Sequence, residues 1–148
     1  MQAAKKAVFL DRDGTIIEDF GYISSPDQIQ FIPGSIDAIK RLNAAGYKVV
    51  VITNQAGVAR GFFSEGMLQA IDKKIGRELL SGGAYVDRFY YCPHHPEHGL
   101  YPYMEACECR KPHDGLIRKA ASDLALDLTA SFMVGDKITD IEAGKKAG

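Results

Sequence analysis

Short apolar runs rich in β-branched residues alternate along the chain with longer segments in which apolar residues recur every three or four positions. The short runs predict buried strands at residues 7–10, 47–53, 86–92 and 131–135. The longer segments predict helices at residues 33–46, 64–80 and 114–126 and from residue 139 onward. Strands that alternate with helices are typical of βαβ units, so the pattern predicts an α/β fold in which a parallel sheet lies between two helical layers.

One stretch, residues 93–112, shows neither period and is rich in Pro, His, Gly and Cys. An irregular segment of this length inside a compact domain is usually a functional loop or is ordered by a ligand. The three cysteines, Cys92, Cys107 and Cys109, cannot all pair within the chain, and they cluster late in it. This distribution indicates metal binding or free thiols rather than a disulfide framework.

Length, composition and charge limit the possible classes of protein. The chain has 148 residues, of which 46% are hydrophobic and 25% charged, and this predicts one domain that spans residues 1–148. The formal net charge of −1 argues against a nucleic-acid binder that works through bulk electrostatics. No apolar stretch has the length of a membrane span or of a secretion signal, so we expect a cytoplasmic monomer with no membrane partner.

The first predicted strand ends at two carboxylates, Asp11 and Asp13, which are followed by Gly14 and Thr15. Asp and Gly are poor strand residues, and the carboxyl end of a parallel strand is where open α/β sheets bind ligands. Two ionised carboxylates one residue apart repel each other unless a cation holds both. The pair therefore indicates a hard metal ion, shared acid/base work, or both, with an ordinary turn after a strand as the alternative.

Polar residues also follow the later strands, and the carboxyl ends of parallel strands lie along one edge of the sheet. Thr53, Asn54 and Gln55 offer a hydroxyl and two amides to phosphate oxygens, although a turn or a helix cap would use the same groups. Arg110 and Lys111 supply two cations, either for phosphate or as a solvated pair. We expect the residues at these strand ends to converge on one site.

Two more carboxylates, Asp136 and Asp140, follow the fourth strand one helical turn apart, so both can face the same site. One would coordinate a metal ion, and the other would orient a metal-bound water or, alternatively, cap the helix. Lys137, between them, would reach a phosphate or lie in solvent.

In chain order these segments are Asp-x-Asp-Gly-Thr at 11–15, Thr-Asn at 53–54, Lys111, and Gly-Asp-Lys-x-x-Asp at 135–140. The order resembles the four-motif pattern of the haloacid dehalogenase superfamily of phosphohydrolases. The resemblance implies a compact Rossmann-like domain without a large cap. It also implies that Asp11 attacks phosphorus to give an aspartyl-phosphate, and that Asp13 protonates the leaving alkoxide and then activates water. Members of the superfamily continue past residue 148 with a further strand, so the resemblance implies an uncovered sheet edge and lower stability.

The same resemblance implies a catalytic Mg²⁺ ion. Its protein ligands would be the carboxylates of Asp11 and Asp136 and the main-chain carbonyl of Asp13. Thr53 and Lys111 would hold the oxygens of the transferring phosphoryl group and stabilise its charge.

The cysteine-rich segment contains a set of side chains that suits a tetrahedral Zn²⁺ ion, namely Cys92, His94, Cys107 and Cys109. His95 and His98 compete for the histidine position, and unligated surface residues are the alternative. Four ligands leave no open position, so the zinc would fold the loop at residues 92–109 rather than do chemistry. A similar loop marks a compact branch of the superfamily that contains heptose bisphosphate phosphatases and histidinol phosphatases.

Within that branch the chain resembles the heptose enzymes more than the histidinol enzymes. Asp19 and Tyr22 lie in a segment similar to their substrate-contacting stretch, and Arg110 matches a residue that would grip the second phosphate. The resemblance implies removal of the 7-phosphate from a sugar bisphosphate, D-glycero-D-manno-heptose 1,7-bisphosphate, in lipopolysaccharide precursor synthesis. Histidinol phosphate is the alternative substrate.

Two kinds of non-enzymatic protein compete with this interpretation. A phospho-receiver domain also combines acidic residues, a Thr and a Lys on a parallel sheet, but it needs neither the Asp-x-Asp-Gly-Thr segment nor a cysteine loop. A zinc-dependent interaction domain would explain the cysteines. It would not explain why Asp11 and Asp13 occur together with Lys111 and Asp136.

Overall fold

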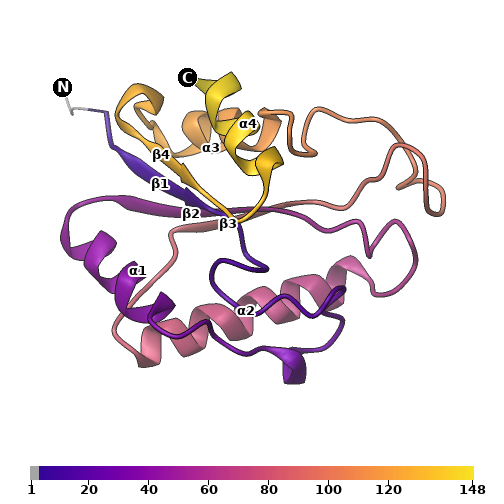
Figure 1. The fold of residues 1–148 in the computed structure, drawn as a ribbon, viewed down its shortest axis with the longest axis horizontal. Coiled ribbons are helices and arrows are strands. Elements are labelled where there is room, and N and C mark those ends of the chain that lie inside the picture. Colours follow the sequence, from indigo (N-terminus) through magenta and orange to yellow (C-terminus); the bar gives the residue numbers. More distant parts are fainter. Residues whose placement is uncertain (1–3) are drawn as a thin grey trace.

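The structure, a computed structural model, describes residues 4–148 and shows within them a four-stranded parallel sheet (Figure 1). The strands lie in the order β3-β2-β1-β4. Their bounds are Ala7–Leu10 for β1, Lys48–Asn54 for β2, Arg88–Cys92 for β3 and Phe132–Val134 for β4. Phe9 at the centre of β1 lies opposite Val50 on one side and Met133 on the other.

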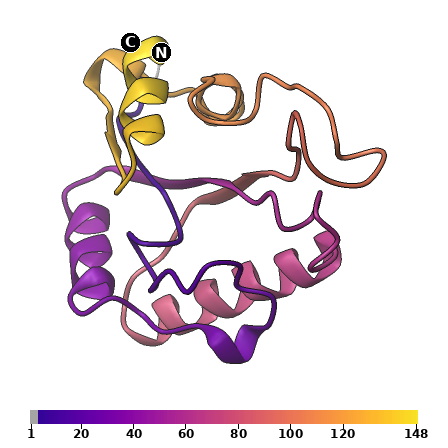
Figure 2. The same cartoon turned by 45° about the vertical axis from the view of Figure 1, so that its right-hand side comes forward.

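Helices cover both faces of this sheet, as Figure 2 shows from a second direction. They are α1 (Ser35–Ala44), α2 (Glu65–Ser81), α3 (Gly115–Leu124) and α4 (Ile138–Ala147), with short 3₁₀ helices at Pro26–Gln28 and Leu128–Ala130. One face packs against α1 and α2, and the other packs against α3 and α4. The predicted three-layer α/β fold is confirmed.

Successive side chains of the two central strands point to opposite faces of the sheet and pack in both halves of the core. Val8 of β1 and Val49 of β2 pack with Ile75 of α2 in one cluster. Phe9 of β1 and Val50 of β2 pack with helices α3 and α4 in the other. Both faces of the sheet are therefore buried. This is why the two strands are continuous apolar runs rather than alternations of apolar and polar residues.

The element boundaries differ from the sequence prediction by one or two residues at most ends. Strand β3 begins at Arg88 rather than at residue 86. Helix α3 ends at Leu124 rather than at residue 126, because Ala125 takes a left-handed conformation with φ of 54°. Residues 93–114 contain no helix or strand, as predicted for the irregular segment.

Strand β4 forms one edge of the sheet in the described part of the chain, and its Phe132 and Val134 are exposed. Beside them lies an apolar cavity of about 510 Å³ lined by residues of β1, α1 and β4. The expectation that an uncovered edge lowers the stability of the protein stays a prediction. None of the helices within residues 4–148 has both the length and the apolar character that crossing a membrane requires.

Candidate active site

The strand ends converge at the carboxyl edge of the sheet, around a cavity of about 460 Å³. Eleven residues singled out from the sequence line this cavity: Asp11, Asp13, Asp19, Tyr22, Thr53, Asn54, Gln55, Arg110, Lys111, Lys137 and Asp140. Asp136 joins the site from the loop after β4, since carboxylate oxygens of Asp11, Asp136 and Asp140 all lie within 4.8 Å of one another. The parallel sheet thus brings together side chains up to about 130 positions apart in sequence.

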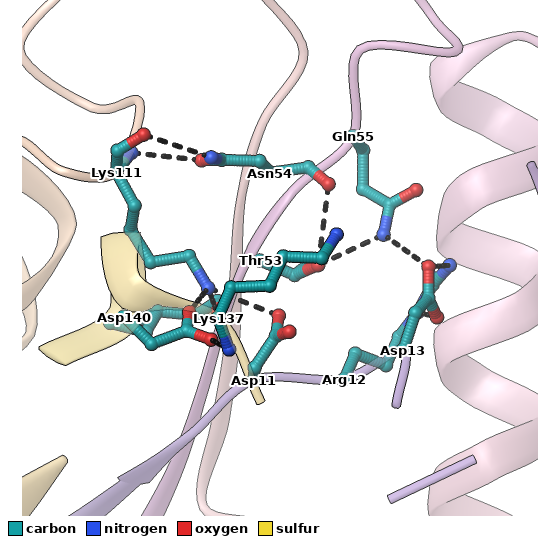
Figure 3. A network of polar contacts seen from close by, with 10 residues as sticks. Asp11, Arg12, Asp13, Thr53, Asn54, Gln55, Lys111, Lys137 and Asp140 are labelled. Atoms are coloured by element: carbon teal, nitrogen blue, oxygen red, sulfur yellow. Dashed lines mark hydrogen bonds and ion pairs between the residues drawn. The ribbon is translucent and has the colours of Figure 1, made fainter. Parts of the chain in front are cut away.

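A buried lysine ties three of these segments together. The Nζ atom of Lys111 donates to Asp11 Oδ1 at 3.0 Å, to the Ile52 carbonyl at 3.0 Å, and to Asp140 Oδ1 (Figure 3). Asp140 is buried, and its second oxygen accepts the Lys137 N–H at 3.1 Å at the start of α4. Asp140 therefore caps its helix, which is one of the two alternatives that the sequence offers, and it also holds the lysine, which the sequence does not predict.

Asn54 fixes the backbone on which this lysine is carried. Its amide Nδ2 donates to the Lys111 carbonyl at 3.1 Å, and its Oδ1 accepts the Lys111 N–H at 2.9 Å. Both polar atoms of the Asn54 side chain are used in this way. Asn54 lines the cavity, but in this structure its side chain positions Lys111.

Asp13 is held on the other side of the site, by different partners. Figure 3 shows Asp11 turned toward Lys111 and Asp140, whereas Asp13 is turned toward Gln55. Gln55 Nε2 donates to Asp13 Oδ2 at 3.1 Å and to Thr53 Oγ1 at 2.9 Å. Because the two carboxylates have separate donors, they lie in one cavity without facing each other directly.

Burial has the largest effect on the pKa of the Asp11 carboxyl group. Removal from water raises the pKa of Asp11 to about 6, an effect that the nearby Lys111 ammonium opposes and the Asp140 carboxylate reinforces. Three carboxylates around a single ammonium leave a surplus of negative charge and several unused oxygens. This donor set suits a hard divalent cation with oxygen ligands, such as Mg²⁺.

Two glycines allow the acidic residues to approach this closely. Gly14 has a φ of +88°, and a Cβ atom placed there would overlap the Asp136 carboxylate. A Cβ atom on Gly135 would overlap the Asp140 carboxylate in the same way. The glycines in the Asp-x-Asp-Gly-Thr and Gly-Asp segments are therefore needed for space at the site.

The cysteine loop gathers a second group of ligand atoms. One atom from each of four side chains lies within 4.8 Å of the others: Cys92, His94, Cys107 and Cys109. The structure selects His94 from the three candidate histidines, since the Nδ1 atom of His95 instead accepts N–H groups of its own loop. The hydrogen bond with Cys92 lowers the pKa of Cys109 to about 5. Three thiols and an imidazole in this arrangement fit a tetrahedral zinc ion.

Further contacts fasten this loop against the site. The carboxylate of Glu65, at the start of α2, accepts the hydroxyls of Tyr91 at 2.7 Å and Tyr103 at 2.6 Å. The Leu100 N–H donates to the Ala59 carbonyl at 2.6 Å. Sequence reasoning missed these contacts, as well as Thr139 in the cavity lining, because no spacing in the sequence marks them.

The sequence matches the haloacid dehalogenase-like hydrolase family over residues 17–148. The chain belongs to this family, and the expected superfamily is confirmed.

Curated relatives extend the match over the segment that holds Asp11 and Asp13. A D-glycero-beta-D-manno-heptose-1,7-bisphosphate 7-phosphatase from Pasteurella multocida is 49% identical over 97% of this chain and 77% of its own length. The protein of that name from Escherichia coli K12 is 42% identical over 99% of this chain and 77% of its own length. A crystal structure of D,D-heptose 1,7-bisphosphate phosphatase from B. bronchiseptica, complexed with magnesium and phosphate, superposes with a TM-score of 0.87. It is 40% identical and covers 97% of this chain and 76% of that one.

The pKa of Asp11 predicts how the Asp11→Asn variant responds to pH. The folded value of about 6 lies above the ordinary value of 3.8, so ionised Asp11 destabilises the metal-free fold above pH 6. In EDTA at pH 8, Asp11→Asn should raise the free energy of unfolding by roughly 1 to 3 kcal/mol. This gain should shrink as the pH falls and vanish below about 3, where the carboxyl is protonated in both states.

Urea denaturation of both proteins across this pH range measures the effect. The matched control is Asp37→Asn, which alters an exposed carboxylate on α1 and should show no such pH-dependent gain. If Asp11→Asn were less stable than the parent at pH 8, the prediction that ionised Asp11 destabilises the metal-free fold would be wrong.

Proposed function

We propose that this protein is a magnesium-dependent phosphomonoesterase that removes the 7-phosphate of D-glycero-D-manno-heptose 1,7-bisphosphate. The observation that carries the proposal is the buried Asp11–Lys111–Asp140 cluster, which opens into the same cavity as Asp13 and Arg110. The names of the curated relatives support the heptose substrate and its β anomer. The proposed place of the reaction is the synthesis of heptose precursors of lipopolysaccharide.

The first chemical step is the transfer of the phosphoryl group to Asp11. Lys111 occupies Oδ1 of Asp11, so the other carboxylate oxygen forms the new bond to phosphorus. The bond between phosphorus and the C7 oxygen breaks, and Asp13 gives its proton to the departing alkoxide. Thr53 and Lys111 hold the phosphoryl oxygens while their charge redistributes.

The second step returns the enzyme to its starting state. Asp13, now a carboxylate, takes a proton from water, and the water oxygen attacks phosphorus. The bond between phosphorus and the Asp11 oxygen breaks, and inorganic phosphate leaves. One residue serves as acid and then as base because the first step leaves it in the form that the second step requires.

The carboxylates of Asp11 and Asp136 and the Asp13 carbonyl are the proposed ligands of Mg²⁺. When bound, the ion would neutralise charge on the phosphoryl group and on the clustered carboxylates. The related B. bronchiseptica structure contains magnesium and phosphate, which supports this assignment.

The remaining cavity residues give the site its proposed specificity. Arg110 has a guanidinium suited to bidentate contact with the second phosphate of a bisphosphate. Asp19, Tyr22 and Lys137 line the same cavity and would contact the sugar. Zinc held by the four-residue Cys/His set would order the wall that carries Arg110, in place of a larger cap.

Release of inorganic phosphate tests the function directly. In Mg²⁺, heptose 1,7-bisphosphate should be hydrolysed through many turnovers and preferred over histidinol phosphate, with heptose 1-phosphate as the product. Asp11→Asn should lower kcat by roughly 10³-fold or more, since a nucleophile that acts as part of a unit is not replaced by its neighbours. Preference for histidinol phosphate, a stop near one turnover, or normal turnover by Asp11→Asn would each contradict the proposal.

Arg110→Ala separates recognition of the second phosphate from chemistry. Loss of a charge-assisted contact should lower kcat/KM for the bisphosphate by roughly 10- to 100-fold. The same variant should change kcat/KM for a simple aryl phosphate by less than about 3-fold, because that substrate has no second phosphate. Arg118→Ala, on the exposed side of α3, is the matched control and should affect neither substrate. Equal losses on both substrates would remove the assigned role.

Cys107→Ala tests the zinc assignment. Metal analysis of the parent should find one zinc per chain, and the variant should lose it together with several degrees of thermal stability, because binding free energy contributes to folding. His98→Ala, in the same loop but outside the ligand set, should keep its zinc. Zinc that remains at one per chain in Cys107→Ala would show that the ligand set is wrong.

A further inference from the structure

An arginine lies fully buried beneath the cavity, between two carboxylates. Arg12 is 0% exposed. Its Nε donates to Asp13 Oδ1 at 2.8 Å and its Nη2 to Asp13 Oδ2 at 3.2 Å, so it grips both oxygens of that carboxylate. Its Nη1 donates to Oδ1 of Asp72 at 3.1 Å, a buried residue on α2. The three side chains form a charge-paired chain from the helix to the cavity.

A buried ion pair of this kind is costly to build. Moving charged groups out of water is expensive, and apolar residues of similar volume often give equal or greater stability at such places. Stability alone therefore gives little reason for a guanidinium and a second carboxylate here. What the pair does provide is direction, because a planar guanidinium accepts few orientations when both of its edges are engaged.

Arg12 and Gln55 together leave Asp13 no free choice of rotamer. Three N–H donors from these two residues point at its two oxygens. Figure 3 shows them on the side of the cavity away from Lys111. Asp72 sets the position of Arg12 in turn, since α2 is packed into the core through Ile71 and Ile75, which are fully buried.

We propose that Arg12 and Asp72 are positioning residues for the acid/base carboxylate of Asp13. They fix Asp13 where it meets the oxygen of the departing group, and they do not touch the substrate themselves. This inference rests on the role of Asp13 in the proposed function. A general acid matters most when the leaving group departs as a poor, strongly basic alkoxide and little when it departs as a stabilised phenolate.

The test compares two substrates that differ in leaving group, heptose 1,7-bisphosphate and p-nitrophenyl phosphate. The variants are Asp72→Asn and the double variant Arg12→Met/Asp72→Asn, which removes both buried charges together. The double variant should lower the single-turnover rate of leaving-group release, which reports the first step alone, by roughly 10- to 100-fold for the heptose substrate and by less than about 3-fold for the aryl substrate. Asp72→Asn should show the same difference between the two substrates, with a smaller loss of rate on the heptose substrate.

The matched control is Asp87→Asn, which alters another partly buried carboxylate that pairs with a cation and accepts a backbone N–H, at the opposite end of the strands. It should lower stability without changing the ratio of the two rates. Circular dichroism and thermal melting establish that each variant is folded, and Asp72→Asn alone decides the question if the double variant does not fold.

The outcomes distinguish failure of this inference from failure of the proposed function. Equal losses of this single-turnover rate on both substrates, or no loss on either, in folded Asp72→Asn and double variants would overturn the positioning role. Asp13→Asn should lower this first-step rate far more for the heptose substrate than for the aryl substrate. If Asp13→Asn instead left the heptose rate unchanged, the acid/base role itself would fail, whatever the Arg12 and Asp72 variants did.

Discussion

The buried ammonium of Lys111 is the interaction on which the site depends. Charge taken out of water must be paired, and here the partners are Asp11 from the end of β1 and Asp140 from the first turn of α4. The two partners lie 100 and 29 positions from the lysine in sequence. The cluster therefore forms only when β1, the loop before α3, and α4 itself are all in place, so the charge state of Asp11 depends on contacts made by the whole fold.

The cysteine loop also helps to fix the position of Lys111. Cys109 immediately precedes Arg110 and Lys111, so whatever fixes the Cys/His set also fixes the backbone from which both cations project. Asn54 then holds the Lys111 backbone through two hydrogen bonds from the end of β2. In the proposed zinc site, the last ligand, Cys109, is two residues from Lys111, so a bound metal would help to fix the backbone of the lysine.

The sequence predicts the fold and most of the cavity because both follow from periodicity and from parallel topology, which gathers strand ends at one edge. It predicts Asp11, Thr53 and Asp136 for this reason. It does not predict the pairing of Arg12 with Asp72 or the tyrosine contacts of Glu65, because both depend on which residues of α2 face inward and how the helix is rotated. Asp72 has the same spacing as an ordinary helix-surface carboxylate, and only packing reveals that it is buried.

Two carboxylates one residue apart can share a phosphate only if they do not compete for the same cation. The structure meets this condition because each carboxylate has its own cationic partner. Lys111 contacts one oxygen of Asp11, which in the proposed mechanism leaves the other oxygen for attack, whereas the Arg12 fork and Gln55 engage both oxygens of Asp13. Successive side chains of an extended segment point to opposite sides, so residues at i and i+2 would normally face the same partner. The bend at Arg12 and the turn that begins at Gly14 break that pattern, so the two carboxylates face different partners.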